Sequence, residues 1–303
     1  MAESRAMVLT APGQMSLQTR AVAEPGPGQV RLAVKATSVN FHDYGGVMGG
    51  IPNLPWPRVA FSDCAAEVEA VGEGVTRVAV GDKVSCNFFR DWIGGRPSPE
   101  LMAVVYGDQI DGFCQSSNVV AAHSLVKAPQ HLSFQEIATL PCAALTAWRS
   151  LVVEAQIKAG DTVVVQGTGG VSVFAIGFAK MLGAEVILTS SSDEKLEKGR
   201  ALGADHLVNY RSNPDWHKAV LEITGGRGAE LVVDIGGADT FPKAVAAAKL
   251  DGIEKVLLAE DATDEHLLAE PTAAANASRT RSSSPSAPPR PKTGRCPATG
   301  KAT

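Results

Sequence analysis

The sequence carries, at residues 163–192, the stretch VVVQGTGGVSVFAIGFAKMLGAEVILTSSS, which decides the fold. It begins with a β-branched run, passes through clustered glycines into a segment of helical length, and returns to a second apolar run that ends in serines. A strand that turns through glycines into a helix predicts a βα unit. The first backbone N–H groups of such a helix are unpaired and suit a pyrophosphate, and a Cβ in the turn would block the phosphates.

The predicted cofactor contacts in this turn are Gly167, Thr168, Gly169, Gly170 and Val171. In the G-x-G-x-x-G pattern the third glycine is replaced by Ser172, a small residue that still allows the helix to pack closely on the strand. A glycine-rich turn alone is often only a turn. Its place within a series of βα units favours nucleotide binding.

The second half of the chain alternates strands with helical segments. Apolar runs at 162–166, 185–189, 206–209 and 230–235 predict strands separated by segments of helical length. This alternation is typical of a doubly wound α/β fold with a parallel sheet. Ahead of it, Ser133 and Glu136 form a capping-box pattern that predicts a helix start, and Pro141 is expected to bend or interrupt that helix.

The first half has a different pattern. Residues 6–128 contain short β-like runs separated by Gly, Pro and Asp, among them 30–34, 67–71 and 83–86, which predict a compact β domain. We therefore expect a substrate-binding β domain at 1–128, a nucleotide-binding domain at 129–258 and an atypical tail at 259–303. Residues 271–303 contain no Val, Ile, Leu, Met or aromatic residue, so this C-terminal tail is predicted to be disordered.

Composition limits the classes of function. The 303 residues are 45% hydrophobic and 20% charged, and we find neither a signal peptide nor an apolar run long enough to span a bilayer. The five cysteines are scattered without a CxxC pair, so we expect reduced thiols and a cytoplasmic protein. The net charge is −4, and six basic and no acidic residues in 271–303 leave −10 on residues 1–270. We expect a small-molecule substrate, with neither nucleic acid nor a membrane as partner.

The choice of cofactor depends on the end of the second strand. NAD sites usually place an acidic residue there, whereas this chain has Ser190 and Ser191, with Lys195 following. Hydroxyls and an ammonium group suit a 2′-phosphate, which predicts NADP(H). A simpler alternative is that the serines cap a helix and Lys195 is only a solvated side chain; Asp193 is a further candidate for the cap.

Several segments in order resemble the medium-chain dehydrogenase/reductase superfamily. The similarity covers roughly the first 250 residues, and is strongest to zinc-independent, quinone-oxidoreductase-like alcohol dehydrogenases. It is carried by EPGPGQVRLAVKATSVNFHDY (24–44), VEAVGEGVTRVAVGDKV (68–84), LPCAALTAW (140–148), the segment 157–210 that includes the glycine turn, and ITGGRGAELVVDIGG (223–237). The resemblance implies a GroES-like β-barrel domain followed by a Rossmann domain.

The resemblance also implies site residues. Asn40 corresponds to an Asn beside the nicotinamide, and Tyr44 to a Tyr that lines the substrate cleft, although it is offset by one position from the Tyr of some relatives. Thr146 resembles a Thr that packs near the nicotinamide, and Tyr210 is placed over the ribose that carries the 2′-phosphate. His42 is a candidate proton donor, but a single loop His is more often a packing or surface residue.

Zinc is not expected. The zinc enzymes of the superfamily place a Cys at the position of Asn40, a His-Glu pair at Ser62-Asp63 and a Cys at Cys142, so this chain keeps only the last. One thiol does not hold a tetrahedral zinc that needs three protein ligands. Hydrogen-bond donors would then polarise the substrate.

The chain departs from the superfamily after about residue 250. Ile253 to Leu258 is expected to form a fifth strand, and no candidate for a sixth strand follows, which suggests an atypical or truncated C-terminus and a weakened homodimer edge. The predicted function is NADPH-dependent hydride transfer to or from a small alcohol or carbonyl, quinone or activated alkene. The alternatives are a family member that binds nucleotide without turnover and a poorly folding product without function.

Overall fold

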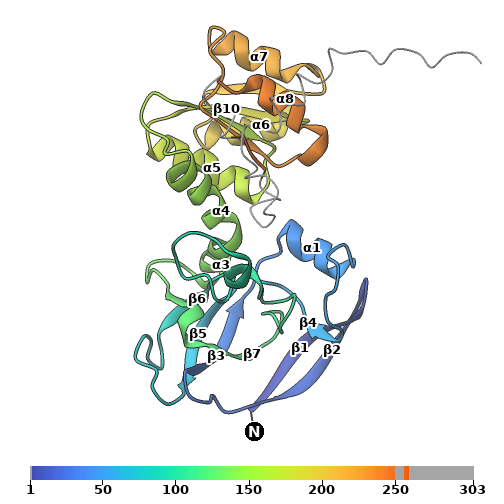
Figure 1. Ribbon diagram of the computed structural model, residues 1–303, viewed down its shortest axis with the longest axis vertical. Helices are drawn as coiled ribbons and strands as arrows, with labels where there is room; N and C mark the ends of the chain where they lie inside the picture. Colours follow the sequence, from blue (N-terminus) through green and yellow to red (C-terminus); the bar gives the residue numbers. More distant parts are fainter. Residues whose placement is uncertain (1, 250–255, 259–303) are drawn as a thin grey trace, which may run out of the picture. The chain divides into compact units, whose positions relative to one another are not determined.

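The computed structural model of the protein describes residues 2–249 and 256–258. In its N-terminal part, the described residues form two antiparallel sheets of order β2-β1-β4 and β7-β3-β5-β6-β8 (Figure 1). The strands are β1 (Ala2–Ala11), β2 (Gln14–Val22), β3 (Gln29–Ala36), β4 (Arg58–Val59), β5 (Ala65–Val71), β6 (Lys83–Cys86), β7 (Ser117–Ala121) and β8 (Leu125–Lys127). Three short helices accompany them: α1 (Phe41–Val47), α2 (Pro99–Met102) and η1 (Ala122–Ser124).

The larger sheet of this part has an apolar face. Val30 and Leu32 of β3 are fully buried and pack with Val68, Val84 and Phe113. The period of two along β3 is the pattern of a strand with one face in the core. The predicted β-like runs at 30–34, 67–71 and 83–86 all fall within strands, so the expectation of an N-terminal β domain is confirmed.

A helical segment follows the β domain. It consists of α3 (Phe134–Ala138), the π-helical turn η2 (Leu140–Ala144), α4 (Leu145–Trp148) and a second π-helical turn, η3 (Arg149–Glu154). The predicted capping box is present, because the Ser133 N–H donates to Glu136 Oε2 at 2.7 Å and the Glu136 N–H donates to Ser133 Oγ at 3.3 Å. Pro141 has no N–H for the helical ladder and lies in η2, which agrees with the predicted interruption.

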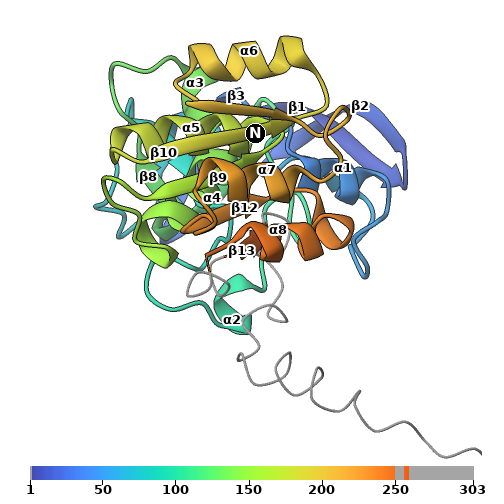
Figure 2. The same cartoon turned by 90° about the horizontal axis from the view of Figure 1, so that it is seen from above.

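The following part is a parallel sheet of order β11-β10-β9-β12-β13. Figure 2 labels β10, β9, β12 and β13 in this sequence across the sheet. The strands are β9 (Thr162–Gln166), β10 (Glu185–Ser190), β11 (His206–Asn209), β12 (Leu231–Asp234) and β13 (Val256–Leu258). The helices between them are α5 (Gly170–Met181), α6 (Asp193–Ala201), α7 (Trp216–Ile223), η4 (Gly237–Asp239) and α8 (Phe241–Ala247).

Helices cover both faces of this sheet. Val163 and Val165 of β9 pack in one core with Ile176 of α5, whereas Val164 packs on the opposite face with Val220 of α7. Burial on both faces explains why β9 is an uninterrupted apolar run rather than an alternating one. The strand order reverses between β9 and β12, and in such sheets ligands bind beyond the carboxyl ends of the strands at that point. The predicted doubly wound fold is confirmed.

Some predictions on this part need correction or lie outside the described residues. Helix α6 is capped by Ser192, whose side chain accepts the Lys195 N–H, so the suggestion that Asp193 caps it is wrong. The expected fifth strand is present as β13, and its predicted beginning at Ile253 lies outside the described residues, as does the predicted disordered tail at 259–303. Among the residues described, no helix is long and apolar enough to cross a membrane.

Candidate functional site

The glycine turn joins β9 to α5 and leaves the start of the helix open. Gly167 has φ +69°, a left-handed conformation that favours glycine, and a Cβ there would lie 2.8 Å from Ile235 Cδ1. Gly169 is the N-cap of α5. Because glycine has no side chain, the backbone N–H groups of the first turn of α5 receive no hydrogen bond from the N-cap residue. Gly169 and Gly170 are exposed. This open helix start fits the pyrophosphate of a dinucleotide.

Ser172 fixes the helix against the strand. Its side chain is buried, and its hydroxyl donates a 2.7 Å hydrogen bond to the backbone carbonyl of Gln166, the last residue of β9. A serine at the third position of the glycine pattern therefore holds the close helix–strand packing that a glycine would allow. Thr168 and Val171, also predicted to contact the cofactor, are partly buried in the same turn.

The residues predicted to select the cofactor lie around the end of β10. Ser190 is buried, and its carbonyl accepts the Tyr210 N–H at 3.0 Å, so these two backbones are adjacent. Ser191 is partly buried and Lys195 is exposed on α6. Asp193 is in the same turn, where its carboxylate accepts a 2.6 Å hydrogen bond from Asn209 Nδ2. The structure thus places Ser190 beside Tyr210 and Lys195 on the following helix, and adds an acidic neighbour in Asp193.

A second cluster surrounds Asn40, the N-cap of α1. The Asn40 N–H donates to Asp43 Oδ2 at 2.7 Å, and its side-chain amide Nδ2 donates to Asp63 Oδ2 at 2.8 Å. Ser38 Oγ donates to the same Asp63 oxygen at 2.5 Å. Asp43 Oδ1 in turn accepts the backbone N–H of Ser62 at 3.0 Å and its hydroxyl at 3.2 Å. Two carboxyl groups therefore fix Asn40, one through its backbone and one through its side chain.

Burial dominates the titration of this cluster. It raises the pKa of Asp63 to about 6, against the hydrogen bonds from Ser38 and Asn40, while the charge of Asp43 adds to the rise and the Cys142 backbone N–H opposes it. The pKa of Asp43 is raised mainly by burial as well. Burial first, and then the charges of Asp63 and Asp43, raise the pKa of the Cys142 thiol, which stays protonated at neutral pH.

These donors do not fit zinc. The positions corresponding to the zinc ligands of the superfamily hold an amide at Asn40, a hydroxyl at Ser62 and a single thiol at Cys142. A zinc site needs deprotonated thiolates, neutral imidazoles or carboxylates in tetrahedral array. Within residues 2–249 and 256–258, no group of three or more His, Cys, Asp and Glu side chains is arranged to hold a metal ion.

Three other candidates have different surroundings. Tyr44 is 57% exposed on α1, with its ring 6.0 Å from that of Phe41. Thr146 lies on α4, partly buried, and its carbonyl accepts the Ser150 hydroxyl at 2.8 Å. His42 Nε2 pairs with the buried Asp108 at 2.7 Å. Burial alone would lower the pKa of His42, but the bond and charge of Asp108, with the charge of Asp43, raise it overall.

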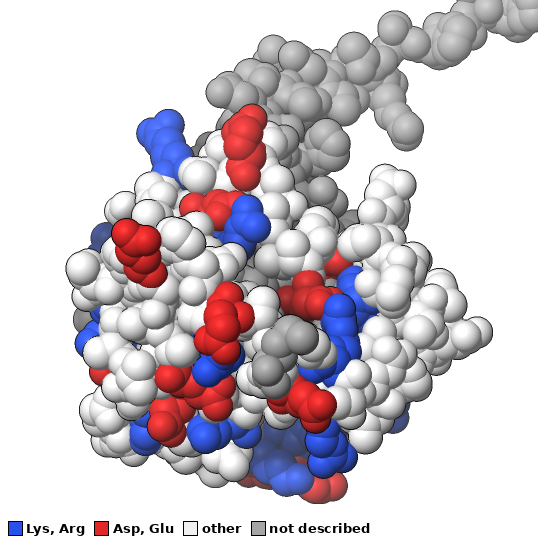
Figure 3. Space-filling model, turned by 90° about the horizontal axis from the view of Figure 1, so that it is seen from below, with Lys and Arg blue, Asp and Glu red and all other residues white. Residues whose placement is uncertain are grey.

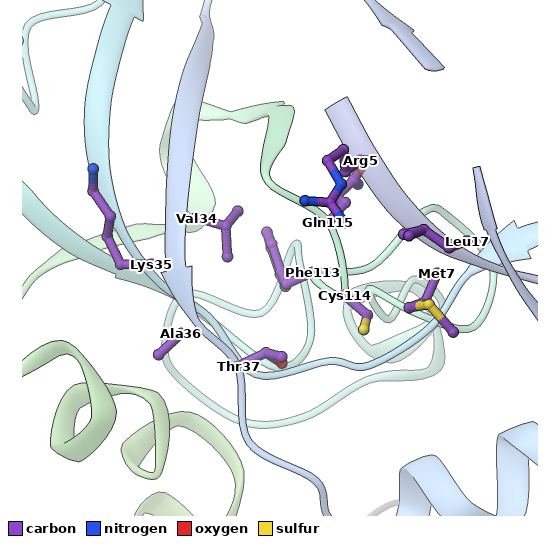
Figure 4. Close-up of a pocket in the computed structure, with 10 residues that line it drawn as sticks. All are labelled: Arg5, Met7, Leu17, Val34, Lys35, Ala36, Thr37, Phe113, Cys114 and Gln115. Carbon is purple, nitrogen blue, oxygen red and sulfur yellow. The ribbon is translucent and has the colours of Figure 1, made fainter. Parts of the chain in front are cut away.

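A surface hollow of about 380 Å³ lies elsewhere, between β1 and β3. Figure 4 shows apolar Met7, Leu17, Val34 and Phe113 around it, with Arg5 and Lys35 among the lining residues. None of the residues predicted for the site is part of its lining. The hollow therefore does not mark the candidate site, which is defined by the glycine turn and the Asn40 cluster.

The sequence pattern does not reveal the contacts of Ser38, Asp43 and Asp63. In the comparison with zinc enzymes, Asp63 corresponds only to the Glu of their His-Glu pair. A signal was present, because this acidic residue stands directly before the uninterrupted small apolar run Cys64, Ala65, Ala66, all of which are buried. A charged group at the edge of such a run needs buried partners. Which partners they are depends on the pairing of β3 with β5.

Comparison with known proteins gives a consistent result. Residues 26–130 match the alcohol dehydrogenase GroES-like domain, and residues 170–257 match the zinc-binding dehydrogenase family. A zinc-type alcohol dehydrogenase-like protein of Schizosaccharomyces pombe is 46% identical over 75% of this chain, and a 2-haloacrylate reductase of Burkholderia sp. is 35% identical over 77%. The chain spans 66% and 65%, respectively, of the lengths of these two relatives.

A solved structure extends the comparison to the fold. An NAD-dependent alcohol dehydrogenase superposes with a TM-score of 0.74 at 38% identity, covering 82% of this chain and 75% of that one. The similarity includes both the β-rich part and the parallel sheet, because neither alone amounts to 82% of the chain.

Proposed function

Because the chain belongs to the medium-chain dehydrogenase/reductase superfamily, with alcohol dehydrogenases and quinone oxidoreductases among its relatives, we propose that it is an NADPH-dependent oxidoreductase that works without zinc. The observation that carries this proposal is the open glycine turn at the carboxyl end of β9, with Gly167 in a left-handed conformation before α5. The proposed reaction is hydride transfer between the nicotinamide and a small carbonyl, quinone or activated alkene.

The residues of the turn fit a dinucleotide. The backbone N–H groups at Gly169 to Val171 would hold the pyrophosphate, and Thr146 and Asn40 would flank the nicotinamide. When bound, the cofactor supplies the hydride. Asn40 would donate an N–H to the substrate oxygen on which negative charge develops, a role that its fixed position favours.

The proposed preference for NADPH depends on the surroundings of Ser190. Ser191, Lys195 and Tyr210 offer hydroxyls and one positive charge to a 2′-phosphate. Two observations favour NADH instead: Asp193 adds a carboxylate to the same turn, and a relative of this chain is an NAD-dependent enzyme. We propose that the Lys195 charge prevails, since Asp193 is already bound by Asn209.

The test compares the cofactor affinities of two charge-reversal variants of α6. Lys195→Glu should weaken NADPH binding roughly 10-fold to 100-fold, the value of a charge-assisted hydrogen bond, and leave NADH binding unchanged. Lys198→Glu, one turn along the same helix beyond Lys195, is the matched control and should change neither affinity by more than about twofold. Equal affinities of the unmodified protein for the two cofactors, measured by fluorescence titration, would contradict the NADPH preference.

The substrate is proposed to be small and apolar. Around Asn40, the residues Val39, Phe41, Tyr44 and Met48 are all more than half exposed, and an exposed group of large hydrophobic residues on and beside one short helix is unusual. Such surface suits a quinone or an activated alkene better than a charged metabolite. NADPH oxidation should therefore be measured with 1,4-benzoquinone and crotonaldehyde; tight NADPH binding without oxidation of either would favour the alternative function of nucleotide binding without turnover.

We propose no nucleic acid partner and a cytoplasmic location. On the face shown in Figure 3, basic and acidic side chains are interspersed rather than gathered in a basic area. A mixed surface does not attract a polyanion. The cysteines of the described residues, Cys64, Cys86, Cys114 and Cys142, are all free thiols, which suits a reducing compartment.

A further inference from the structure

Asp63 is a buried carboxyl group to which the proposed reaction assigns no part. It lies two residues before β5, and its side chain is completely inaccessible to solvent. One of its oxygens, Oδ2, accepts hydrogen bonds from both Ser38 Oγ and Asn40 Nδ2, and its backbone carbonyl accepts the Thr37 hydroxyl at 2.7 Å. Three polar contacts, from Thr37, Ser38 and Asn40, thus join the segment between β3 and α1 to Asp63.

We infer that Asp63 is a positioning residue that orients the side-chain amide of Asn40 for the reaction. A primary amide carries two protons on nitrogen, and Asp63 accepts one of them, so a single N–H is left for a ligand. The contact fixes the rotation of the Asn40 side chain and thereby the direction of that second N–H. The inference rests on the proposed function, which places Asn40 beside the nicotinamide and the substrate.

A carboxylate is well suited to this role. Hydrogen bonds to an ionised acceptor are about twice as strong as those between neutral groups, and they are more strongly directional inside a protein. Asp43 completes the arrangement, because it binds the Asn40 backbone N–H on the helix side and Ser62, the neighbour of Asp63, on the other. The two acids together hold Asn40 in place before any ligand arrives, which is the condition for electrostatic stabilisation of a transition state.

The competing explanation is that Asp63 only holds the segment between β3 and α1 in place. Ser38 offers the matched control, since its hydroxyl binds the same carboxylate oxygen at 2.5 Å but it is not part of the proposed site. Loss of the Ser38 contact should weaken the local structure. The hydrogen bond from Asn40 Nδ2 to Asp63 should remain, so the Asn40 side chain should keep its orientation.

The experiment measures NADPH-dependent reduction of 1,4-benzoquinone by Asp63→Asn, Ser38→Ala, Asn40→Ala and the double variant of Asp63 and Asn40. We expect Asp63→Asn to lower kcat roughly tenfold or more while the NADPH dissociation constant stays within about twofold. Ser38→Ala should lower the melting temperature without a comparable fall in kcat. In the Asn40→Ala background, Asp63→Asn should add less than about a twofold loss, because the group through which it acts is absent.

A second measurement does not need turnover. In the free protein with selectively labelled asparagine, the two side-chain amide protons of Asn40 should differ in exchange rate by NMR, and Asp63→Asn should reduce this difference, because a neutral amide oxygen is a weaker acceptor, while Ser38→Ala keeps it. An equal kcat loss from Asp63→Asn with and without Asn40, or unchanged amide signals, would overturn the positioning role. If Asn40→Ala itself leaves kcat unchanged, the proposed function of Asn40 fails, whatever the NMR result for Asp63.

Discussion

At the scale of single residues, the buried acids near Asn40 make stability depend on pH in an unusual direction. Ionisation of Asp63 is harder in the folded protein, where its pKa is about 6, than in the unfolded chain, where it is near 3.8. The contribution of Asp63 to the free energy of unfolding is therefore greatest below about pH 4 and falls as the pH rises through about 6. Most surface carboxyls in ion pairs behave in the opposite way.

This dependence is testable in Asp63→Asn. The pKa of Asp63 differs by about two units between the folded and unfolded states, which corresponds to a contribution of about 3 kcal/mol to the free energy of unfolding. The free energy of unfolding should be measured in urea at about pH 4.5, 5.5 and 6.5. As the pH rises over this range, it should fall less in the variant than in the unmodified protein. Some loss should remain, because burial also raises the pKa of Asp43. The same slope in both proteins would show that Asp63 titrates normally.

At the scale of elements, the β9–α5 connection combines a left-handed backbone position with the proposed cofactor site. Gly167 and Gly177 are ten sequence positions apart, yet their environments differ in kind. Gly167 has φ +69° and meets Ile235, whereas Gly177 lies within α5 with open space where a Cβ would be. The turn requires glycine at position 167. Gly177, by contrast, is a poor helix former at an exposed position of α5.

The two glycines therefore predict opposite effects of the same substitution. Gly167→Ala should destabilise the protein by about 1–3 kcal/mol and weaken NADPH binding, because alanine is strained at this φ. Gly177→Ala should stabilise it by about 1 kcal/mol and leave binding unchanged. Chemical denaturation and cofactor titration of both variants check the pair. Loss of binding in Gly177→Ala, or none in Gly167→Ala, would count against the assignment of the turn.

At the scale of the whole molecule, cofactor and metal should affect thermal stability differently. A ligand that binds only the folded state stabilises it by about 2.7 kcal/mol at 100 times its dissociation constant, equivalent to a rise in Tm of about 5–10 °C. We expect this rise with NADPH and no change with excess EDTA, because an amide, a hydroxyl and a single thiol do not make up the three protein ligands of a zinc site. Differential scanning calorimetry, with elemental analysis for zinc as the control, checks both. One tightly held zinc per chain, or a fall in Tm with EDTA, would disprove the zinc-independent assignment.

The sequence by itself determined the parts of the fold that depend on local pattern. The apolar run of β9, the glycines after it and the capping box at Ser133 each predict an element from a few adjacent residues, and each element is present where it was expected. Periodicity and turn chemistry act over about ten residues, so they are legible in the chain. The same holds for Gly167, whose role follows from its place between a strand and a helix.

Only the tertiary structure decided what surrounds Asn40. Asp63 is 23 residues from Asn40 in the sequence, and Asp108 is 66 residues from His42, so neither contact has a local signature. The Asn40–Asp63 contact arises because antiparallel pairing of β3 with β5 brings the segments that flank these strands together. The pKa of Asp63 follows from the same cause, since burial is a property of the packed molecule. Hydrogen bonds between distant segments are fixed by strand pairing and core packing, and these depend on the whole fold.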